Sequence, residues 1–223
     1  MKIYFWGRWM RKIFFLLLLS LAVSAALSSE TVNFDEVQAG QLPPHWIASM
    51  TGQGTPRWSV EKDESAPSKP NVLKQSGQAT YPLALKADAE LRNGFVEVKF
   101  KPIAGEEDQA GGVVWRAKDA DNYYICRANA LEGNVVLYKT EKGKRKSLDI
   151  VGRKGGYGLD TPVPPQKWHT LRVEFEGSRF QVWLNGKHLF DVQDGTFPGP
   201  GMVGLWTKAD SVTLFDDFSY GSK

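Results

Sequence analysis

Apolar and polar residues alternate with a period of two along much of the chain after residue 94. In Phe95–Lys101, every second residue is apolar and charged residues stand between them. Successive side chains of a β-strand point to opposite faces, so this alternation predicts strands with one face in a core. Comparable stretches, bounded by Gly, Pro, Asn or Asp, are 112–116, 122–129, 135–139, 171–175, 180–184, 188–190, 201–206 and 212–218.

The connections between these stretches favour an all-β fold. Asn185-Gly186 separates two of them and predicts a hairpin, because a type I′ turn needs positive φ at both positions. No stretch indicates an amphipathic helix of useful length; 84–92 could form a short one, but Gly94 ends it. Many short strands joined by polar turns predict a two-sheet antiparallel β-sandwich.

The first 25 residues have the three parts of a secretory signal. Basic residues without an acidic one come first, then the apolar run Ile13–Leu21, then the small-x-small sequence Val23-Ser24-Ala25. We therefore predict a signal peptide over 1–25 and a single domain over 26–223, exported to the periplasm or secreted. The alternative is an uncleaved anchor, but Ile13–Leu27 is shorter than the roughly 20 residues that span a bilayer. After cleavage we expect no stable membrane insertion.

Removal of this segment changes the charge balance. The whole chain has 28 basic and 25 acidic residues, and the four basic residues Lys2, Arg8, Arg11 and Lys12 leave with the signal. The remaining domain is close to neutral, so nucleic acid is not an expected partner. Cys126 is the single cysteine, so the chain cannot form an intramolecular disulfide.

Several segments together resemble a known superfamily. They are 111–116, 121–129, 133–138, 168–172, 182–186 and 204–210. As a set they resemble the concanavalin A-like lectin/glucanase superfamily, and within it the laminin-G-like domains and the 3-keto-disaccharide hydrolase-like family. The resemblance implies a jelly roll of two curved antiparallel sheets, whose concave face often holds carbohydrate.

Alternation also separates the side chains that point to the core from those that point away. If Trp115, Tyr124, Val182 and Leu205 are core residues, a polar and aromatic set lies on the opposite faces of their strands. Aromatic rings stack on the apolar face of a sugar, while Arg and Asn bind its hydroxyl groups. The predicted ligand-binding residues are Arg116, Tyr123, Arg127, Asn129, Trp183 and Trp206. The alternative is that the tryptophans form a second small core under a loop and that the arginines pair with acidic neighbours across strands.

Catalytic residues are not assigned by the sequence. Glycoside hydrolysis normally needs two carboxylates, and the Glu-x-Asp-x-(x)-Glu pattern of retaining glucanases in this superfamily is absent. Glu174 and Glu176 share a strand face, but a solvated sheet face is the simpler interpretation. The segment 111–116 also lacks the Asn-Ser that precedes this strand in longer members of the hydrolase-like family. Whether the protein is an enzyme is therefore open.

The resemblance also implies a structural calcium ion where the first and last strands meet. Hard cations prefer oxygen ligands, and the available ones are Asp35 and the pair Asp216-Asp217, of which Asp35 and Asp217 are the predicted ligands. The alternative is that Phe-Asp-Asp-Phe leaves one Asp in water at a strand edge.

The function predicted from these features is an exported carbohydrate-binding β-sandwich domain. One alternative is a glycoside hydrolase or lyase that acts on 3-keto-disaccharides or related glycans. Another is a non-catalytic scaffold for interactions in the cell envelope.

Overall fold

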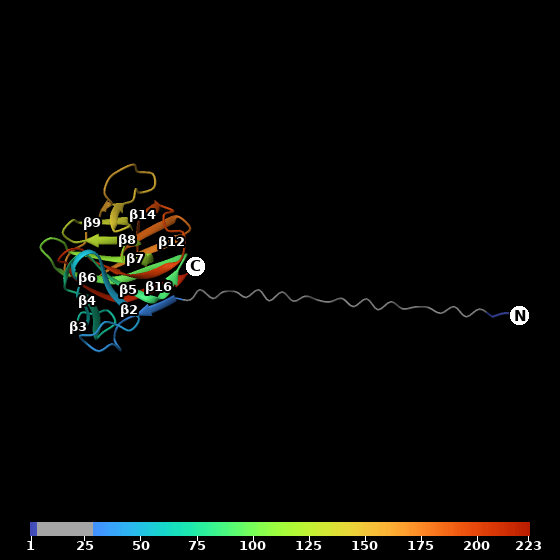
Figure 1. The fold of residues 1–223 in the computed structure, drawn as a ribbon, viewed down its shortest axis with the longest axis horizontal. Helices are drawn as coiled ribbons and strands as arrows, with labels where there is room; N and C mark the ends of the chain where they lie inside the picture. The colour runs from blue at the N-terminus through green and yellow to red at the C-terminus, as the bar shows by residue number, and fades with distance from the viewer. Residues whose placement is uncertain (4–28) are drawn as a thin grey trace.

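A computed structural model describes residues 1–3 and 29–223, and its described part consists of strands, turns and loops without a helix. The strands form two antiparallel sheets that pack face to face (Figure 1). This confirms the predicted two-sheet sandwich. Most of the predicted signal peptide lies outside the described residues. Within the described ranges, no helix has the length and apolar character needed to cross a membrane.

Sheet A contains eight strands: β1 (Ser29–Val32), β3 (Trp58–Lys62), β4 (Asn71–Gln75), β6 (Gly94–Ala104), β12 (His169–Glu176), β13 (Arg179–Leu184), β14 (Lys187–Gln193) and β16 (Val212–Ser222). Their order across the sheet is β14-β13-β12-β6-β16-β4-β3, and β1 pairs with β16. The β13–β14 hairpin turns at Asn185 and Gly186, whose φ angles of 52° and 76° confirm the predicted turn.

Sheet B also contains eight strands: β2 (Trp46–Thr55), β5 (Gln78–Leu91), β7 (Ala110–Asp119), β8 (Asn122–Asn129), β9 (Asn134–Glu141), β10 (Lys144–Ser147), β11 (Leu159–Asp160) and β15 (Gly201–Trp206). Their order is β10-β9-β8-β7-β15-β5-β2, and β11 pairs with β9. In both sheets a strand from the end of the chain lies between strands from its first half, which is the crossing connectivity of a jelly roll.

An aromatic group joins the two sheets. Trp115 of β7 is fully buried and stacks on Tyr124 of β8 and Phe175 of β12, with ring centroids 5.5 and 5.9 Å apart. Phe180 of β13 meets the Trp115 ring edge-on at 5.3 Å. Trp115 and Tyr124 come from sheet B and the two phenylalanines from sheet A, so stacking and apolar burial hold the layers together. Cys126 lies in the same core, where burial raises the pKa of its thiol.

The segment 84–92, for which the sequence allowed a short helix, does not form one. Residues 84–91 belong to β5, which pairs with β2 on one side and β15 on the other. Ala84, for example, lies opposite Ala48 and Leu205. Backbone hydrogen bonds to two neighbouring strands outweigh the helix preference of an Ala- and Leu-rich segment, and the local sequence does not contain those neighbours.

Close packing of β15 against β5 predicts the effect of one substitution. A Cβ atom on Gly204 would lie 2.3 Å from the carbonyl oxygen of Ala84, a backbone atom that cannot turn away. Gly204→Ala should therefore lower the free energy of unfolding by about 1–3 kcal/mol in urea denaturation. Gly199→Ala is the control, because no atom lies within 4 Å of its added Cβ. Equal stability of the two variants would contradict this view of the β5–β15 contact.

Candidate functional site

The face of sheet B that points away from sheet A carries most of the predicted site. Tyr123, Arg127 and Asn129 alternate along β8 with the core residues Tyr124 and Cys126, as predicted. Trp206 reaches the same face from β15, because Trp206 pairs with Gly112 of β7 and Gly112 pairs with Arg127. Four of the six predicted side chains therefore share one surface, here called the outer face of sheet B.

Trp183 does not share that surface. It lies in β13, where it pairs with Arg172 and His188, and its ring meets the His188 ring edge-on at 5.2 Å. These residues form the outer face of sheet A. Trp183 and Trp206 therefore lie on different sheets and do not share one face. Alternation along a strand tells which side chains point away from the core, but it does not tell which sheet the strand joins.

Arg116 also departs from the prediction. Its φ is +50° and the register between β7 and β8 shifts after Trp115, so the strand bulges and the side chain turns toward the rim of the core. The guanidinium lies 5.6 Å from the ring centroids of Phe175 and Phe180. It donates hydrogen bonds to the carbonyl oxygens of Phe197 at 3.0 Å and Gly177 at 2.7 Å. Arg116 therefore closes one end of the core.

Arg127 is fully buried on the outer face of sheet B and organises a polar cluster. Its Nη2 donates to Glu132 Oε2 at 2.7 Å, to the Tyr138 hydroxyl at 2.9 Å and to the Tyr157 hydroxyl at 3.1 Å. Its Nη1 donates to the side chain and the carbonyl oxygen of Asn134. We call these five residues the Arg127 cluster. Most N–H groups of the buried cation thus have acceptors, which such a group requires.

Two carboxylates meet beside this cluster. Asn129 Nδ2 donates to Asp108 Oδ1 at 2.6 Å and to Glu132 Oε1 at 3.2 Å. Lys208 Nζ lies 2.5 Å from Asp108 Oδ2 and 4.0 Å from Glu132 Oε1. Sequence reasoning missed Asp108, Glu132 and Lys208 because they lie in connections between strands, where alternation gives no signal. The one sequence signal for Glu132 was its position in the short turn between Asn129 and Asn134, which keeps it close to those two polar residues.

The environment of Glu132 sets its charge. Partial burial by itself would raise its pKa, but the positive charge of Arg127 and hydrogen bonds from Asn134 and Arg127 hold the pKa below its usual value. At neutral pH Glu132 is therefore an anion. With Asp108, Arg127 and Lys208 it forms a network in which two acidic and two basic side chains alternate.

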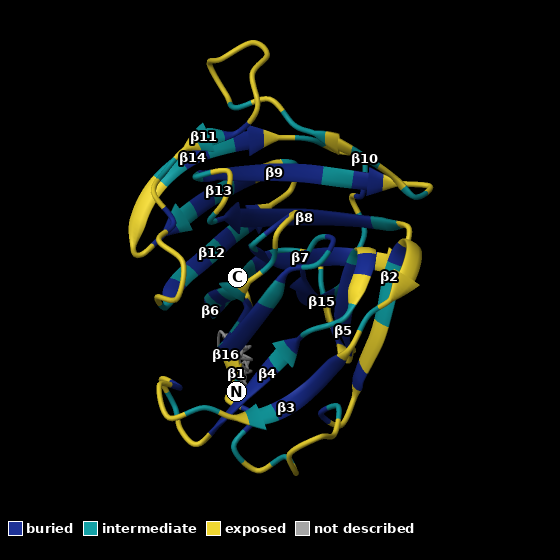
Figure 2. Ribbon diagram, turned by 90° about the vertical axis from the view of Figure 1, so that its left-hand side faces the viewer, coloured by how far each residue is buried: buried dark blue, intermediate teal, exposed yellow. Residues whose placement is uncertain are grey.

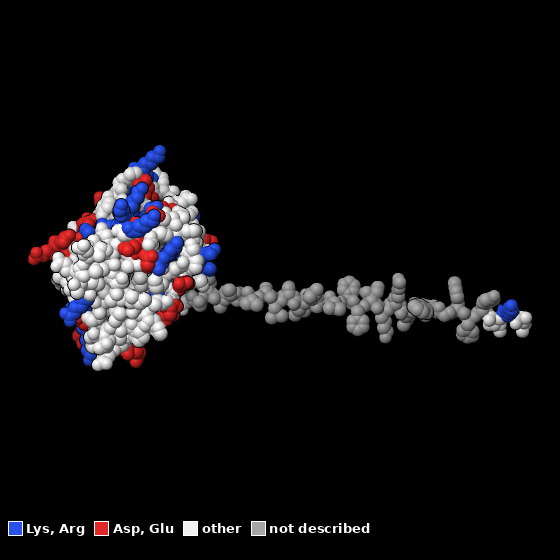
Figure 3. All heavy atoms as spheres, viewed as in Figure 1, with Lys and Arg blue, Asp and Glu red and all other residues white. Residues whose placement is uncertain are grey.

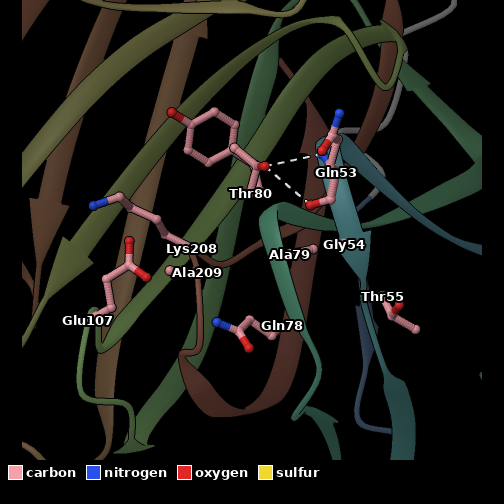
Figure 4. Close-up of a pocket in the computed structure, with 10 residues that line it drawn as sticks. Gln53, Gly54, Thr55, Gln78, Ala79, Thr80, Glu107, Lys208 and Ala209 are labelled. Carbon is pink, nitrogen blue, oxygen red and sulfur yellow. Dashed lines mark hydrogen bonds between the residues drawn. The ribbon is translucent and has the colours of Figure 1, made fainter.

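A groove opens next to the network. Its walls come from β2, β5 and the connections that carry Glu107 and Lys208, and Figure 4 shows Gln53 and Thr55 across from Lys208 and Glu107. Thr80 and Gln53 hold one wall in place, because Thr80 Oγ1 accepts a hydrogen bond from the backbone N–H of Gln53 at 3.1 Å and donates one to the backbone carbonyl oxygen of Gln53 at 3.2 Å. We call this the Lys208 groove. Its lining residues are Gln53, Gly54, Thr55, Gln78, Ala79, Thr80, Tyr81, Glu107, Lys208 and Ala209.

The aromatic residue of this groove is Tyr81 rather than Trp206. Trp206 has no exposed surface and packs with Leu83 and Ile125 in a second apolar cluster on the outer face. Tyr81 is partly exposed, lines the groove and stacks on Trp206 with ring centroids 5.4 Å apart. The alternative of a second small core therefore describes Trp206, whose role is to support Tyr81 from below. A second hollow meets the Arg127 cluster at Tyr157 and Asn134.

The predicted calcium ligands lie away from this face. Asp217 Oδ2 is 2.7 Å from Lys99 Nζ, and Asp35 Oδ1 accepts from the amide of Asn71 at 3.1 Å. In the described part of the chain, no three His, Cys, Asp or Glu side chains are grouped so that they could hold a metal ion. A calcium site at Asp35 and Asp217 stays a prediction.

The fold defines the structural class of this protein: a two-sheet β-sandwich of the concanavalin A-like jelly-roll type. Residues 42–219 match the family model of the 3-keto-alpha-glucoside-1,2-lyase-like domain, and the chain belongs to this family. The resemblance seen in the sequence is thereby confirmed.

The solved structures that share the fold include a carbohydrate-binding module and a β-glucanase. The carbohydrate-binding module CBM66 from Bacillus subtilis superposes with a TM-score of 0.62 at 22% identity, over 80% of this chain and 96% of that one. A β-glucanase from Bacillus licheniformis superposes with a TM-score of 0.52 at 12% identity, over 87% of this chain and 98% of that one.

A curated relative is the levanase of Bacillus subtilis strain 168. It is 30% identical over 97 residues, which make up 43% of this chain. The match spans only 13% of the length of the levanase.

The Glu132–Arg127 ion pair allows us to predict how the stability of the protein depends on Glu132 and on pH. Glu132→Gln removes a charge-assisted hydrogen bond to a buried cation and should lower the free energy of unfolding by about 1.5–3 kcal/mol at pH 7. The pKa of Glu132 is lower in the folded protein than in the unfolded chain, where it is about 4.3. Ionised Glu132 therefore stabilises the folded protein fully at pH values above about 4.3, and this stabilisation is lost as the pH falls through the folded-state pKa.

The difference between wild type and Glu132→Gln should therefore shrink below about pH 4, measured by urea denaturation across pH. Glu106→Gln is the matched control, because Glu106 is exposed and its carboxylate has no ion pair among the described residues. A difference that stays constant from neutral to acidic pH would contradict the assigned role of Glu132.

Proposed function

We propose that this protein is an exported carbohydrate-binding domain that holds a saccharide in the Lys208 groove. One observation carries the proposal: a partly exposed aromatic ring, Tyr81, lies in a groove that adjoins a network of fixed polar groups. An aromatic ring binds the apolar face of a sugar ring, and fixed donors and acceptors bind its hydroxyl groups. This is the chemistry that oligosaccharide recognition needs.

The groove offers both kinds of hydrogen-bonding group. Gln53 and Gln78 each carry an amide that donates and accepts, Lys208 donates and Glu107 accepts. Lys208 is held by Asp108, so part of this polar surface is already ordered before a ligand arrives, which lowers the entropic cost of binding. The family assignment and the levanase and CBM66 similarities support a glycan as the ligand. The near-neutral domain gives no reason to expect nucleic acid.

A second candidate function is catalysis on a 3-keto-glycoside. The observation that favours it is the pair of carboxylates, Asp108 and Glu132, which share the amide of Asn129. Against it stands the lowered pKa of Glu132, because a carboxylate held as an anion is a weak base and is not protonated at neutral pH to act as an acid. Binding without turnover therefore agrees better with the site.

Substitutions on the two sheets test the binding site. Tyr81→Ala removes the aromatic surface of the groove and should weaken glycan binding about tenfold, which corresponds to about 1.4 kcal/mol. Trp183→Ala is the control, since it removes an aromatic side chain from the outer face of sheet A and should leave binding unchanged. A glycan array followed by affinity electrophoresis provides the measurement.

Loss of binding in Trp183→Ala with normal binding in Tyr81→Ala would move the site to sheet A. No binding by the wild-type protein to any glycan would reject the proposal. Product analysis after incubation with 3-keto-disaccharides, with and without a divalent metal, decides the second candidate, because turnover would show that the protein is an enzyme.

Export can be tested on the full chain expressed in a bacterial host. Cleavage after Ala25 should give a mature protein that begins at Ala26 and accumulates in the periplasm or the medium. Intact-mass spectrometry of these fractions reads out the first residue. A protein that keeps residues 1–25 and stays in the membrane fraction would support the uncleaved anchor instead.

A further inference from the structure

Arg145 occupies an unusual position on the outer face of sheet B. It lies in β10, at the edge of the sheet, and its guanidinium faces three aromatic rings. The distances from the guanidinium carbon to the ring centroids are 4.3 Å for Tyr138, 4.5 Å for Tyr81 and 5.5 Å for Trp206. We call these rings the aromatic floor. Tyr81 belongs both to this floor and to the Lys208 groove, so Arg145 contacts a residue that lines the groove.

The guanidinium of Arg145 has no counter-charge in the described part of the chain. It forms no side-chain hydrogen bond or ion pair there, and its Nη1 is buried without an acceptor. Arg127, on the same face, has Glu132 and several neutral acceptors, and Arg116 has three carbonyl oxygens. Contact with aromatic rings offsets part of the cost of burying a cation, but it leaves the N–H groups without acceptors.

The unpaired group on this face is therefore a cation. Buried polar groups are normally paired, so a guanidinium nitrogen without an acceptor indicates a missing partner. The partner that fits a cation best is an anion.

The surrounding charge also favours an anion. The segment 139–154 contains seven basic residues and two acidic ones, Glu141 and Asp149. Figure 1 shows the loop after β10 projecting from one end of the molecule, and Figure 3 shows Lys and Arg side chains gathered toward that end. Lys208 also lines the groove, but Asp108 at 2.5 Å and Glu132 at 4.0 Å pair with it, so the positive charge that favours an anion comes from the segment 139–154.

We propose that Arg145 binds an acidic group of the saccharide, so that the ligand is an anionic glycan. A carboxylate or a sulfate on a sugar ring has the oxygen atoms that a guanidinium binds with two parallel hydrogen bonds. A sugar ring on Tyr81 then places its acidic substituent over the aromatic floor. The inference rests on the proposed function, since it names the class of glycan that the Lys208 groove takes.

Matched pairs of oligosaccharides test this inference in the folded protein. One pair is an oligogalacturonate and its methyl ester, and another is a sulfated oligosaccharide and its desulfated form, with neutral oligosaccharides as a further arm. Wild type should bind the acidic member of one pair at least about tenfold more tightly than its neutral counterpart, by isothermal titration. A preference within the oligogalacturonate pair would indicate recognition of a carboxylate, and a preference within the sulfated pair would indicate recognition of a sulfate. The preference should weaken as salt is added.

Two variants separate direct contact from general charge. Arg145→Gln should abolish the preference for the acidic member, whereas Lys146→Gln should keep it. Lys146 is exposed, neighbours Arg145 on the same strand and points to the opposite face. Lys146→Gln therefore removes an equal charge without changing the aromatic floor. Urea denaturation of both variants checks that Arg145→Gln remains folded.

The failure of this inference is distinguishable from failure of the proposed function. Tight binding of neutral glycans with no preference for acidic ones would overturn the role of Arg145 and leave carbohydrate binding in place. Equal weakening of acidic and neutral ligands in Arg145→Gln would also overturn it, because Arg145 would then only support the aromatic floor. No binding in any arm would overturn both.

Discussion

Burial of the Arg127 guanidinium near the middle of sheet B is the constraint around which the outer face is built. A cation without exposed surface needs an anion and several acceptors, and strand β8 cannot supply them from its own backbone. The turn after β8 supplies Glu132, β9 supplies Tyr138 and Asn134, and the loop before β11 supplies Tyr157. Segments that would otherwise be free connections are thereby fixed in place.

This arrangement makes β8 and β9 buried on both faces (Figure 2). Their inner side chains pack against sheet A, and their outer ones lie under aromatic rings and ion pairs. The outer layer differs from the core because its tyrosines are amphipathic. The Tyr138 ring packs beside Arg145 while its hydroxyl accepts from Arg127, and the partly exposed Tyr81 stacks on Trp206. Tyr81 is the member of this layer that also lines the Lys208 groove, so in the proposed function one side chain both stabilises the sheet and contacts the saccharide.

The sequence predicted the fold and a part of the site well. Alternation along β8 correctly placed Tyr123, Arg127 and Asn129 on one face, because period two is a local property of an extended chain. It failed for Arg116, where a bulge reverses the side chain. For Trp183 it gave the outward direction but not the fact that the strand belongs to the other sheet. Asp108, Glu132 and Lys208 lie in connections without periodicity, so their meeting depends on how distant strands are joined.

The sequence by itself therefore determined the class of structure: strands, their inward and outward residues, the Asn185-Gly186 turn and the single buried thiol. Each follows from chemistry within a few residues of the chain. Only the tertiary structure decided that Tyr81 rather than Trp206 faces the groove, and that Arg145 lies over three rings without a counter-charge among the described residues. Those facts depend on the order and register of strands far apart in the sequence, which no local pattern encodes.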